Sequence, residues 1–205
     1  APTLGPLPLP VTVGARLTAL RPAALRSAFS GQANALLVRH DVAVAGHETL
    51  PLNPPDFRRE TASLLGLDAL AALAWGKESR AAQALRLRLP YGHGVCLVAT
   101  HATSFPSDPA VPDAEVARAA RWLATLAAPG EIAVLAGDLN VPPHASPALR
   151  ALAAAGFSPA APWIDQILVR GAAVVGTPVT WPDTARTTAA GLLLSDHAPV
   201  EVTIA

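Results

Sequence analysis

The sequence is poor in charged and aromatic residues, and its charges cancel. Charged side chains make up 15% of the 205 residues, with 15 Lys and Arg against 15 Asp and Glu, and aromatic residues make up 4%. This composition does not favour sequence-tolerant nucleic-acid binding, which relies on a basic groove and on rings that stack with bases. Affinity for a phosphate group therefore has to come from a few local side chains or from a metal ion.

Three further absences narrow the class of protein. The single cysteine, Cys96, excludes a disulfide within the chain, and its position in the apolar run 94–98 favours a small buried side chain over a reactive thiol. No run reaches the ~18 apolar residues of a membrane span, and residues 1–10, with four prolines, lack the basic start and unbroken apolar core of a signal peptide. A soluble protein of undetermined compartment is expected. The absence of methionine indicates a processed product or a segment of a longer chain.

The pattern of apolar residues predicts one α/β domain. A chain of this length with 51% hydrophobic residues is sufficient for one core, and no linker is apparent. Short apolar runs bounded by Gly, Pro or charge predict strands at 35–38, 84–89, 95–100, 132–136, 164–169 and 200–204. Helical spacing predicts helices at 61–75, 113–127 and 146–155, the last capped by Ser146 before Pro147. Connections partly by helices and partly by hairpins favour mixed sheets.

Polar side chains stand where two of these apolar runs stop. His101 ends one predicted strand, and Asp138 and Asn140 follow another, where they would share one face if the strand geometry continued. A carboxylate and a carboxamide on one face orient a water molecule and hold an anion. Simpler interpretations remain open, because His101 also fits a hydrogen-bonded structural residue and the other two residues also suit a turn.

Two more acidic residues stand out near the end of the chain. Asp165 lies among Ile and Leu, where a carboxylate is costly to bury unless it is paired, and a histidine is its natural partner. Asp196 and His197 are adjacent, just before the last predicted strand. Adjacent strand residues face opposite ways, so these two side chains converge on one site only if a special turn lies there. A plain turn into the strand is the alternative.

Four motifs in this order resemble the endonuclease/exonuclease/phosphatase superfamily, which includes deoxyribonuclease I. They are Thr100-His101, Gly137-Asp138-Leu139-Asn140, Ile164-Asp165-Gln166-Ile167-Leu168 and Ser195-Asp196-His197-Ala198-Pro199-Val200, with weaker matches at Asn34-Ala35-Leu36-Leu37-Val38-Arg39 and Glu78-Ser79-Arg80-Ala81. The resemblance covers about residues 31–205, which we expect to form the domain, with residues 1–30 as an irregular lead-in. It implies an α/β fold, a four-layer sandwich of two packed mixed β-sheets flanked by helices, with the site at the edge where strand ends gather.

The resemblance also implies a function and a set of roles. It implies a metal-dependent hydrolase of phosphodiester or phosphomonoester bonds, of the nuclease or phosphodiesterase type. Asp196, with Asp138 and Asn140, is expected to bind Mg²⁺, or Mn²⁺ in its place. Asp138 and Asn140 are also expected to position the attacking water and the phosphate. His197 is expected to act as general base or phosphate donor, with Asp165 fixing its ring.

Three other residues are expected to contact the substrate. His101 would donate to a phosphate oxygen as charge develops, and Asn34 and Arg80 would bind the substrate. For Arg80 the alternative is an arginine that faces solvent from a strand. The expected partner is a phosphodiester substrate, whether nucleic acid, a small phosphorylated molecule or a lipid, and the chain is expected to be a monomer with no obligate protein partner.

The chain departs from the superfamily at its start. Members open with a strand that carries an Asn and a later strand that ends in Gln-Glu, whose Glu is a principal metal ligand, whereas residues 1–30 contain no Asp or Glu. Glu48 and Glu60 are the nearest acidic substitutes, although nothing in their neighbourhood indicates a metal site. The alternative function is therefore a catalytically weak or inactive homologue that serves as a binding or structural module.

Overall fold

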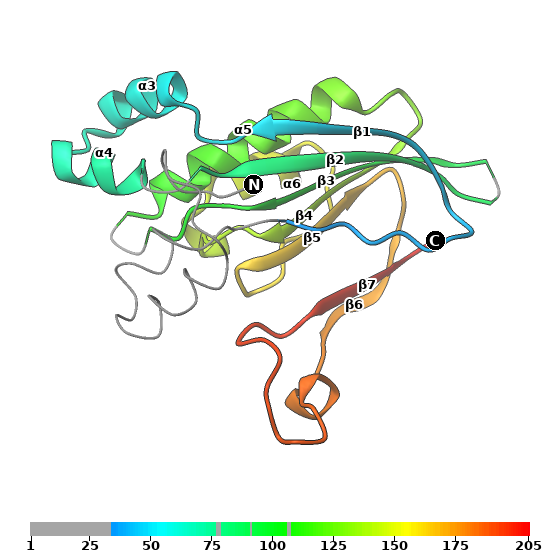
Figure 1. The fold of residues 1–205 in the computed structure, drawn as a ribbon. Helices are drawn as coiled ribbons and strands as arrows, with labels where there is room; N and C mark the ends of the chain where they lie inside the picture. The colour runs from blue at the N-terminus through cyan, green and yellow to red at the C-terminus, as the bar shows by residue number, and fades with distance from the viewer. Residues whose placement is uncertain (1–33, 77–78, 91, 106–107) are drawn as a thin grey trace.

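A five-stranded mixed sheet forms the centre of the protein. The computed structural model describes residues 34–205 except 77–78, 91 and 106–107. The strands lie in the order β1-β2-β3-β4-β5, and each neighbouring pair is antiparallel except β3 and β4, which are parallel (Figure 1). Their bounds are β1 Ala43–Pro51, β2 Ala81–Arg88, β3 Gly94–His101, β4 Ile132–Asp138 and β5 Asp165–Arg170.

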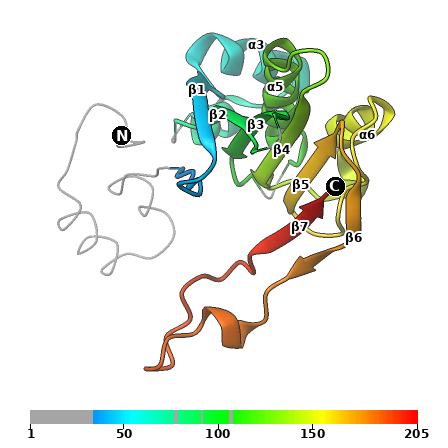
Figure 2. The same cartoon turned by 90° about the vertical axis from the view of Figure 1, so that its right-hand side faces the viewer.

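Helices cover one face of this sheet. Helix α5 (Ala110–Leu126) connects the parallel strands β3 and β4, and α6 (Pro147–Ala154) lies between β4 and β5. Both pack on the face from which Val98, Leu135 and Leu168 project, and together they form the largest buried cluster. Helices α3 (Pro55–Leu65) and α4 (Ala69–Trp75) connect β1 to β2 beside α5 (Figures 1 and 2). None of the described helices is long and apolar enough to cross a membrane.

One end of a second, two-stranded sheet packs against the face of the main sheet that the helices leave uncovered. Strands β6 (Val174–Thr180) and β7 (Val200–Ile204) are antiparallel, and Val174 and Ile204 contact a small cluster built on Val134 and Val169. From this end the two strands and the segment that joins them extend away from the helices (Figure 2). We call residues 174–204 the arm.

The predicted fold class is confirmed, because the structure is a mixed α/β fold with a larger and a smaller sheet and with helices on the larger one. Cys96 is fully buried in the main core, as predicted. The predicted caps of α6 are also present: the Ser146 side chain accepts a hydrogen bond from the Leu149 amide, and Pro147 begins the helix. The predicted lead-in, residues 1–30, lies outside the described residues.

Several predicted elements were wrong in detail. The run 35–38 forms no strand, and Leu37 is 99% exposed, because an apolar run without a partner strand has nothing to pack on. Strands β1 and β6 were missed because they are mostly exposed and lack clear alternation. The predicted helix 61–75 is two helices: Gly66, with φ 67°, ends α3, and the Asp68 side chain caps α4.

Candidate active site

Strand register places three of the predicted site residues side by side. His101, the last residue of β3, pairs with Asp138, the last residue of β4, and Asp138 pairs in turn with Asp165, the first residue of β5. Side chains of paired residues on neighbouring strands project from the same face of a sheet. The end of the sheet therefore carries one imidazole and two carboxylates in a row.

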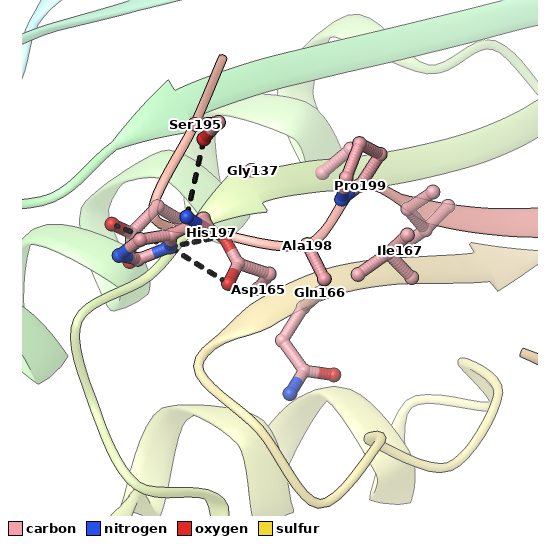
Figure 3. A pocket seen from close by; sticks show the side chains of 11 residues that line it. Gly137, Asp165, Gln166, Ile167, Ser195, His197, Ala198 and Pro199 are labelled. Atoms are coloured by element: carbon pink, nitrogen blue, oxygen red, sulfur yellow. Dashed lines mark hydrogen bonds and ion pairs between the residues drawn. The ribbon is translucent and has the colours of Figure 1, made fainter. Parts of the chain in front are cut away.

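The fourth side chain, His197, comes from the arm. Its Nδ1 lies 2.9 Å from Oδ2 and 3.2 Å from Oδ1 of Asp165 (Figure 3). The same nitrogen is 3.8 Å from Oδ2 of Asp138, and Nε2 of His101 is 3.5 Å from that oxygen. The Ser195 hydroxyl accepts a hydrogen bond of 3.1 Å from the His197 amide, which closes a turn around Asp196. The predicted contact between His197 and Asp165 is thus present.

Asp138, Asp165, Ser195 and His197 border an open pocket of about 310 Å³. Asp138, Asp165 and His197 supply its charged groups, and Ile167 and Pro199 are among its apolar lining residues. Figure 3 shows the pair of Asp165 and His197 at one end and the two apolar side chains at the other. The pocket therefore suits a molecule with a charged group beside an apolar one.

The surroundings of Asp165 and His197 shift the pKa of both side chains. Burial raises the pKa of Asp165, and the negative charge of Asp138 raises it further, although His197 opposes both effects. Burial lowers the pKa of His197, but the charges of Asp165 and Asp138 and the hydrogen bond to Asp165 outweigh burial, so that this pKa is raised overall. Two carboxylates this close together favour a cation between them, either an imidazolium or a metal ion.

The turn after β4 is built into the site. Asn140 has φ 50°, so the strand geometry ends at Asp138, and the condition under which the two side chains would share a strand face is not met. The backbone amide of Asn140 donates to Oδ1 of Asp138 at 2.9 Å, and the side-chain Nδ2 of Asn140 donates to the Ala102 carbonyl, also at 2.9 Å. Asp138 thus uses one carboxylate oxygen for the turn and directs the other toward the histidines. The turn and the candidate site are one feature.

A glycine is required just before Asp138. Gly137 has φ 132°, and a Cβ atom there would lie 1.8 Å from the carbonyl oxygen of Thr100 in β3. This close approach occurs one residue before the paired His101 and Asp138. Any side chain at position 137 would therefore separate the two strands at the site.

The remaining predicted residues lie around this centre. Asp196 is exposed and is not part of the group formed by Asp138, Asp165 and His197. The Asn34 side chain donates to the carbonyl of Ala81, which begins β2 beside the end of β3. Arg80 is 7% exposed, so the alternative of a solvent-facing arginine was wrong.

The two acidic substitutes for the family's glutamate do not join this centre. Glu48 and Glu60 are both exposed, the first in β1 and the second on α3. Within the described part of the chain, neither belongs to the acidic group with metal-ligand spacing.

Sequence reasoning missed two residues that support the site. Glu115 of α5 is fully buried and accepts hydrogen bonds of 2.7 Å from the Thr103 amide, the Thr103 hydroxyl and Nε1 of Trp75. Glu115 lies one helical turn before Ala119, on the apolar face of α5, and this position in the sequence could have indicated a buried acid. Arg186 of the arm donates to the carbonyls of Ser195 and His197 and had no sequence signal.

The donor atoms at the centre fit a divalent cation. Asp138, Asp165 and His197 each offer one ligand atom, and these atoms lie within 4.8 Å of one another. Carboxylate oxygens are the ligands that hard divalent cations prefer. The half-buried carboxylates also supply the negative charge that such an ion neutralises.

The sequence model of the endonuclease/exonuclease/phosphatase family matches residues 14–197. The match includes His101, Asp138, Asp165 and His197. The chain belongs to this family. Members of the endonuclease/exonuclease/phosphatase family are nucleases, phosphodiesterases and phosphatases, so the chemistry of the family is hydrolysis of phosphate esters.

Solved structures agree with this assignment at the level of the fold. A conserved protein of unknown function from Enterococcus faecalis matches with a TM-score of 0.54 and 16% identity, over 80% of this chain and 67% of that one. Truncated TDP2 from Caenorhabditis elegans matches with a TM-score of 0.52 and 16% identity, over 82% and 68%. The chain therefore spans about two thirds of the length of these two structures. Comparison with curated proteins gives no significant match.

Proposed function

We propose that the chain is a metal-dependent phosphodiester hydrolase in which water attacks phosphorus beside the pair of Asp165 and His197. The observation that supports it best is the convergence of two carboxylates and two imidazoles, from β3, β4, β5 and the arm, at one end of the sheet, where Asp138, Asp165 and His197 line one pocket. Membership of a family of phosphate-ester hydrolases supplies the class of reaction.

His197 is assigned to the phosphate. Its Nδ1 is occupied by Asp165, which leaves Nε2 to face the substrate. Nε2 would either take a proton from the attacking water or donate to a phosphate oxygen as negative charge builds. Both roles predicted for His197 stay in the proposal. His101 supplies a second donor from β3.

The attacking water is assigned to Asp138 and Asn140. Asp138 is held by the Asn140 amide through one oxygen and directs its other oxygen toward the histidines. As the new P–O bond forms, the water gives up its proton, the ester P–O bond breaks, and the departing alkoxide takes a proton. A phosphodiester thus yields a phosphomonoester and an alcohol.

A divalent cation is assigned to the same carboxylates. Asp138 and Asp165 would hold it, and Mg²⁺ is the proposed ion with Mn²⁺ as a substitute. The bound ion would supply positive charge to the phosphate oxygens. Because only two carboxylates among the described residues belong to the group with metal-ligand spacing, we expect Mg²⁺ to bind weakly in the absence of a substrate phosphate.

The substrate is assigned only by class. The pocket has charged groups at one end and apolar side chains at the other, which suits a phosphodiester in a nucleic acid, a small phosphorylated molecule or a lipid. Asn34 and Arg80, at the same end of the sheet, are the proposed further substrate contacts. All of these residues belong to one chain, so a monomer suffices for the reaction.

The test is turnover of bis-nitrophenyl phosphate at increasing Mg²⁺ concentration, with calorimetry of Mg²⁺ binding alongside. We expect His197→Ala to lower turnover by ~10²-fold or more, the usual scale for an acid or base group. His93→Ala is the matched control, because His93 is exposed at the opposite end of the sheet, in the turn between β2 and β3.

Three results would contradict the proposal. Full activity of His197→Ala would remove His197 from the reaction. Turnover that survives complete removal of divalent ions would exclude the metal. Mg²⁺ binding without any turnover would favour the alternative, an inactive homologue that serves as a binding or structural module.

A further inference from the structure

Arg186 ties together the two segments of the arm that lie nearest the site. It ends the short 3-10 helix Asp183–Arg186, on the outgoing segment of the arm, whereas His197 lies on the returning segment. Its Nη1 donates to the carbonyl of Ser195 and, at 3.2 Å, to the carbonyl of His197. Its own carbonyl accepts a hydrogen bond of 2.9 Å from the Leu194 amide.

The two carbonyls bound by Arg186 belong to the peptide group before Asp196 and to the peptide group after His197. One nitrogen thus holds both ends of this two-residue stretch, and this limits the direction in which the His197 side chain leaves the backbone. The guanidinium is planar and rigid, so it imposes this geometry with little loss of its own freedom. Only 12% of the Arg186 side chain is exposed, although the arm around it is mostly exposed.

The returning segment needs such support because strand pairing does not reach it. The bridge between Thr187 and Leu193 lies before it, and the first ladder pair of β7, Val200 with Thr180, lies after it. Between these two pairings, the Ser195 hydroxyl closes the turn from within, and Asp165 binds the His197 ring from the sheet. The outgoing segment of the arm adds the contacts of Arg186 and, at the far end of the stretch, the Trp181 amide, which donates to the Pro199 carbonyl at 3.0 Å.

We propose that Arg186 is a positioning residue that sets the orientation of His197 toward the phosphate. This inference rests on the proposed function. The Arg186 side chain acts through the backbone and not on the substrate, because its Nη1 binds the two carbonyls and its Nη2 forms an ion pair with Asp183.

The test compares Arg186→Ala and Arg186→Lys with the unchanged protein. We expect Arg186→Ala to lower kcat about 10-fold or more and to leave KM within about 2-fold, because the loss affects the orientation of His197 and not substrate binding. Arg186→Lys retains the charge but not the planar fork, so it should recover only part of kcat. Added guanidinium ion at ~50 mM should restore part of kcat in Arg186→Ala and none in His197→Ala.

Two controls separate the carbonyl contacts from the ion pair. Arg59 on α3 forms an ion pair with Asp56 at the same three-residue spacing, and Arg59→Ala should leave kcat unchanged. Asp183→Asn removes the ion pair of Arg186 but leaves both carbonyl contacts, and we expect it to change kcat by less than about 2-fold.

A readout that needs no turnover distinguishes this inference from the proposed function. In Arg186→Ala, amide hydrogen exchange at His197 should accelerate at least 10-fold, and the NMR signal of the His197 ring should move toward that of the exposed His93. If the unchanged protein fails to turn over, the proposed function fails, and the NMR comparison still decides the role of Arg186. Unchanged kcat together with unchanged His197 signals would overturn the inference, and so would a loss of kcat that guanidinium does not restore.

Discussion

The candidate site joins two regions that are held in place by different interactions. His101, Asp138 and Asp165 stand at the end of the five-stranded sheet, where ladder hydrogen bonds and strand register fix them. His197 stands on the arm, where the side chains of Arg186, Ser195 and Asp165 hold it. Changes at the sheet positions of the site should therefore affect both activity and stability, whereas changes at the arm residues that hold His197 should affect activity with little effect on stability.

Burial differs between these two regions in the same way. Val98 and Leu135 of the sheet are fully buried, whereas Val175 and Val179 of the arm are 53% and 57% exposed. Burial of apolar surface contributes about 25 cal/mol per Å², so most of the packing energy belongs to the sheet and its helices. The arm contributes the proposed catalytic side chain, His197, although little of its own surface is buried.

The largest difference is expected between two glycines with positive φ. Gly137→Ala on the sheet places a Cβ against the Thr100 carbonyl, whereas at Gly176 on the arm, with φ 73°, a Cβ meets nothing within 4 Å. We expect Gly137→Ala to cost at least about 3 kcal/mol and to abolish turnover, since it combines backbone strain with overpacking. Gly176→Ala should cost about 1 kcal/mol and leave turnover nearly unchanged. Chemical denaturation and turnover measure both, and equal costs would contradict the comparison.

A second expected effect concerns the pH dependence of stability. Burial raises the pKa of Glu115, and the hydrogen bonds from Trp75 and Thr103 oppose it. The folded protein therefore binds this proton more tightly than the unfolded chain, so the stabilisation is complete below the ordinary value of 4.5 and is lost as pH rises through the folded pKa. Glu115→Gln should flatten this decline in the free energy of unfolding. Glu60→Gln, at an exposed position, is the control, and equal slopes in all three proteins would contradict the assignment.

The sheet part of the site was predictable from sequence because apolar runs mark buried strands. His101 and Asp138 each end such a run, and both lie at the same end of the sheet. The pairing of Asp165 with a histidine followed from the cost of burying an isolated carboxylate. Register itself was not predictable, since it depends on the pairing of strands distant in sequence.

The arm was harder to predict. Strand β6 contains Gly176 and Pro178 and is mostly exposed, so no hydrophobic alternation marks it. Arg186 binds the backbone carbonyls of residues 195 and 197. Because every residue has a carbonyl, no residue pattern in the sequence indicates these contacts. Interactions between side chain and backbone therefore supply the part of this site that sequence reasoning missed.

A third prediction tests whether Asn140 belongs to the reaction or only to the turn. Glycine adopts the positive φ of Asn140 without strain, so Asn140→Gly retains the turn and removes only the hydrogen bond to Ala102, at a cost of about 1 kcal/mol. If the side chain positions the phosphate, turnover should fall about 10-fold or more. Turnover of Asn140→Asp should fall further, because the aspartate adds negative charge and cannot donate to the Ala102 carbonyl. Full turnover in Asn140→Gly would assign the residue to the turn alone.

The smallest effect is expected at Trp181, which tests whether the arm acts as a unit or only through its site turn. The Trp181 ring donates from Nε1 to Oε2 of Glu201 at 3.0 Å, in an exposed part of the arm. Trp181→Phe removes this bond and keeps an aromatic ring, so the free energy of unfolding should change by less than about 0.5 kcal/mol, as for most surface substitutions. Turnover should stay within about 2-fold of the unchanged protein, in contrast to the loss expected for Arg186→Ala, because Trp181 contacts no carbonyl of residues 195–197. A loss of turnover as large as that of Arg186→Ala would mean that any destabilisation of the arm displaces His197. Arg186 would then have no role beyond stabilising the arm as a whole.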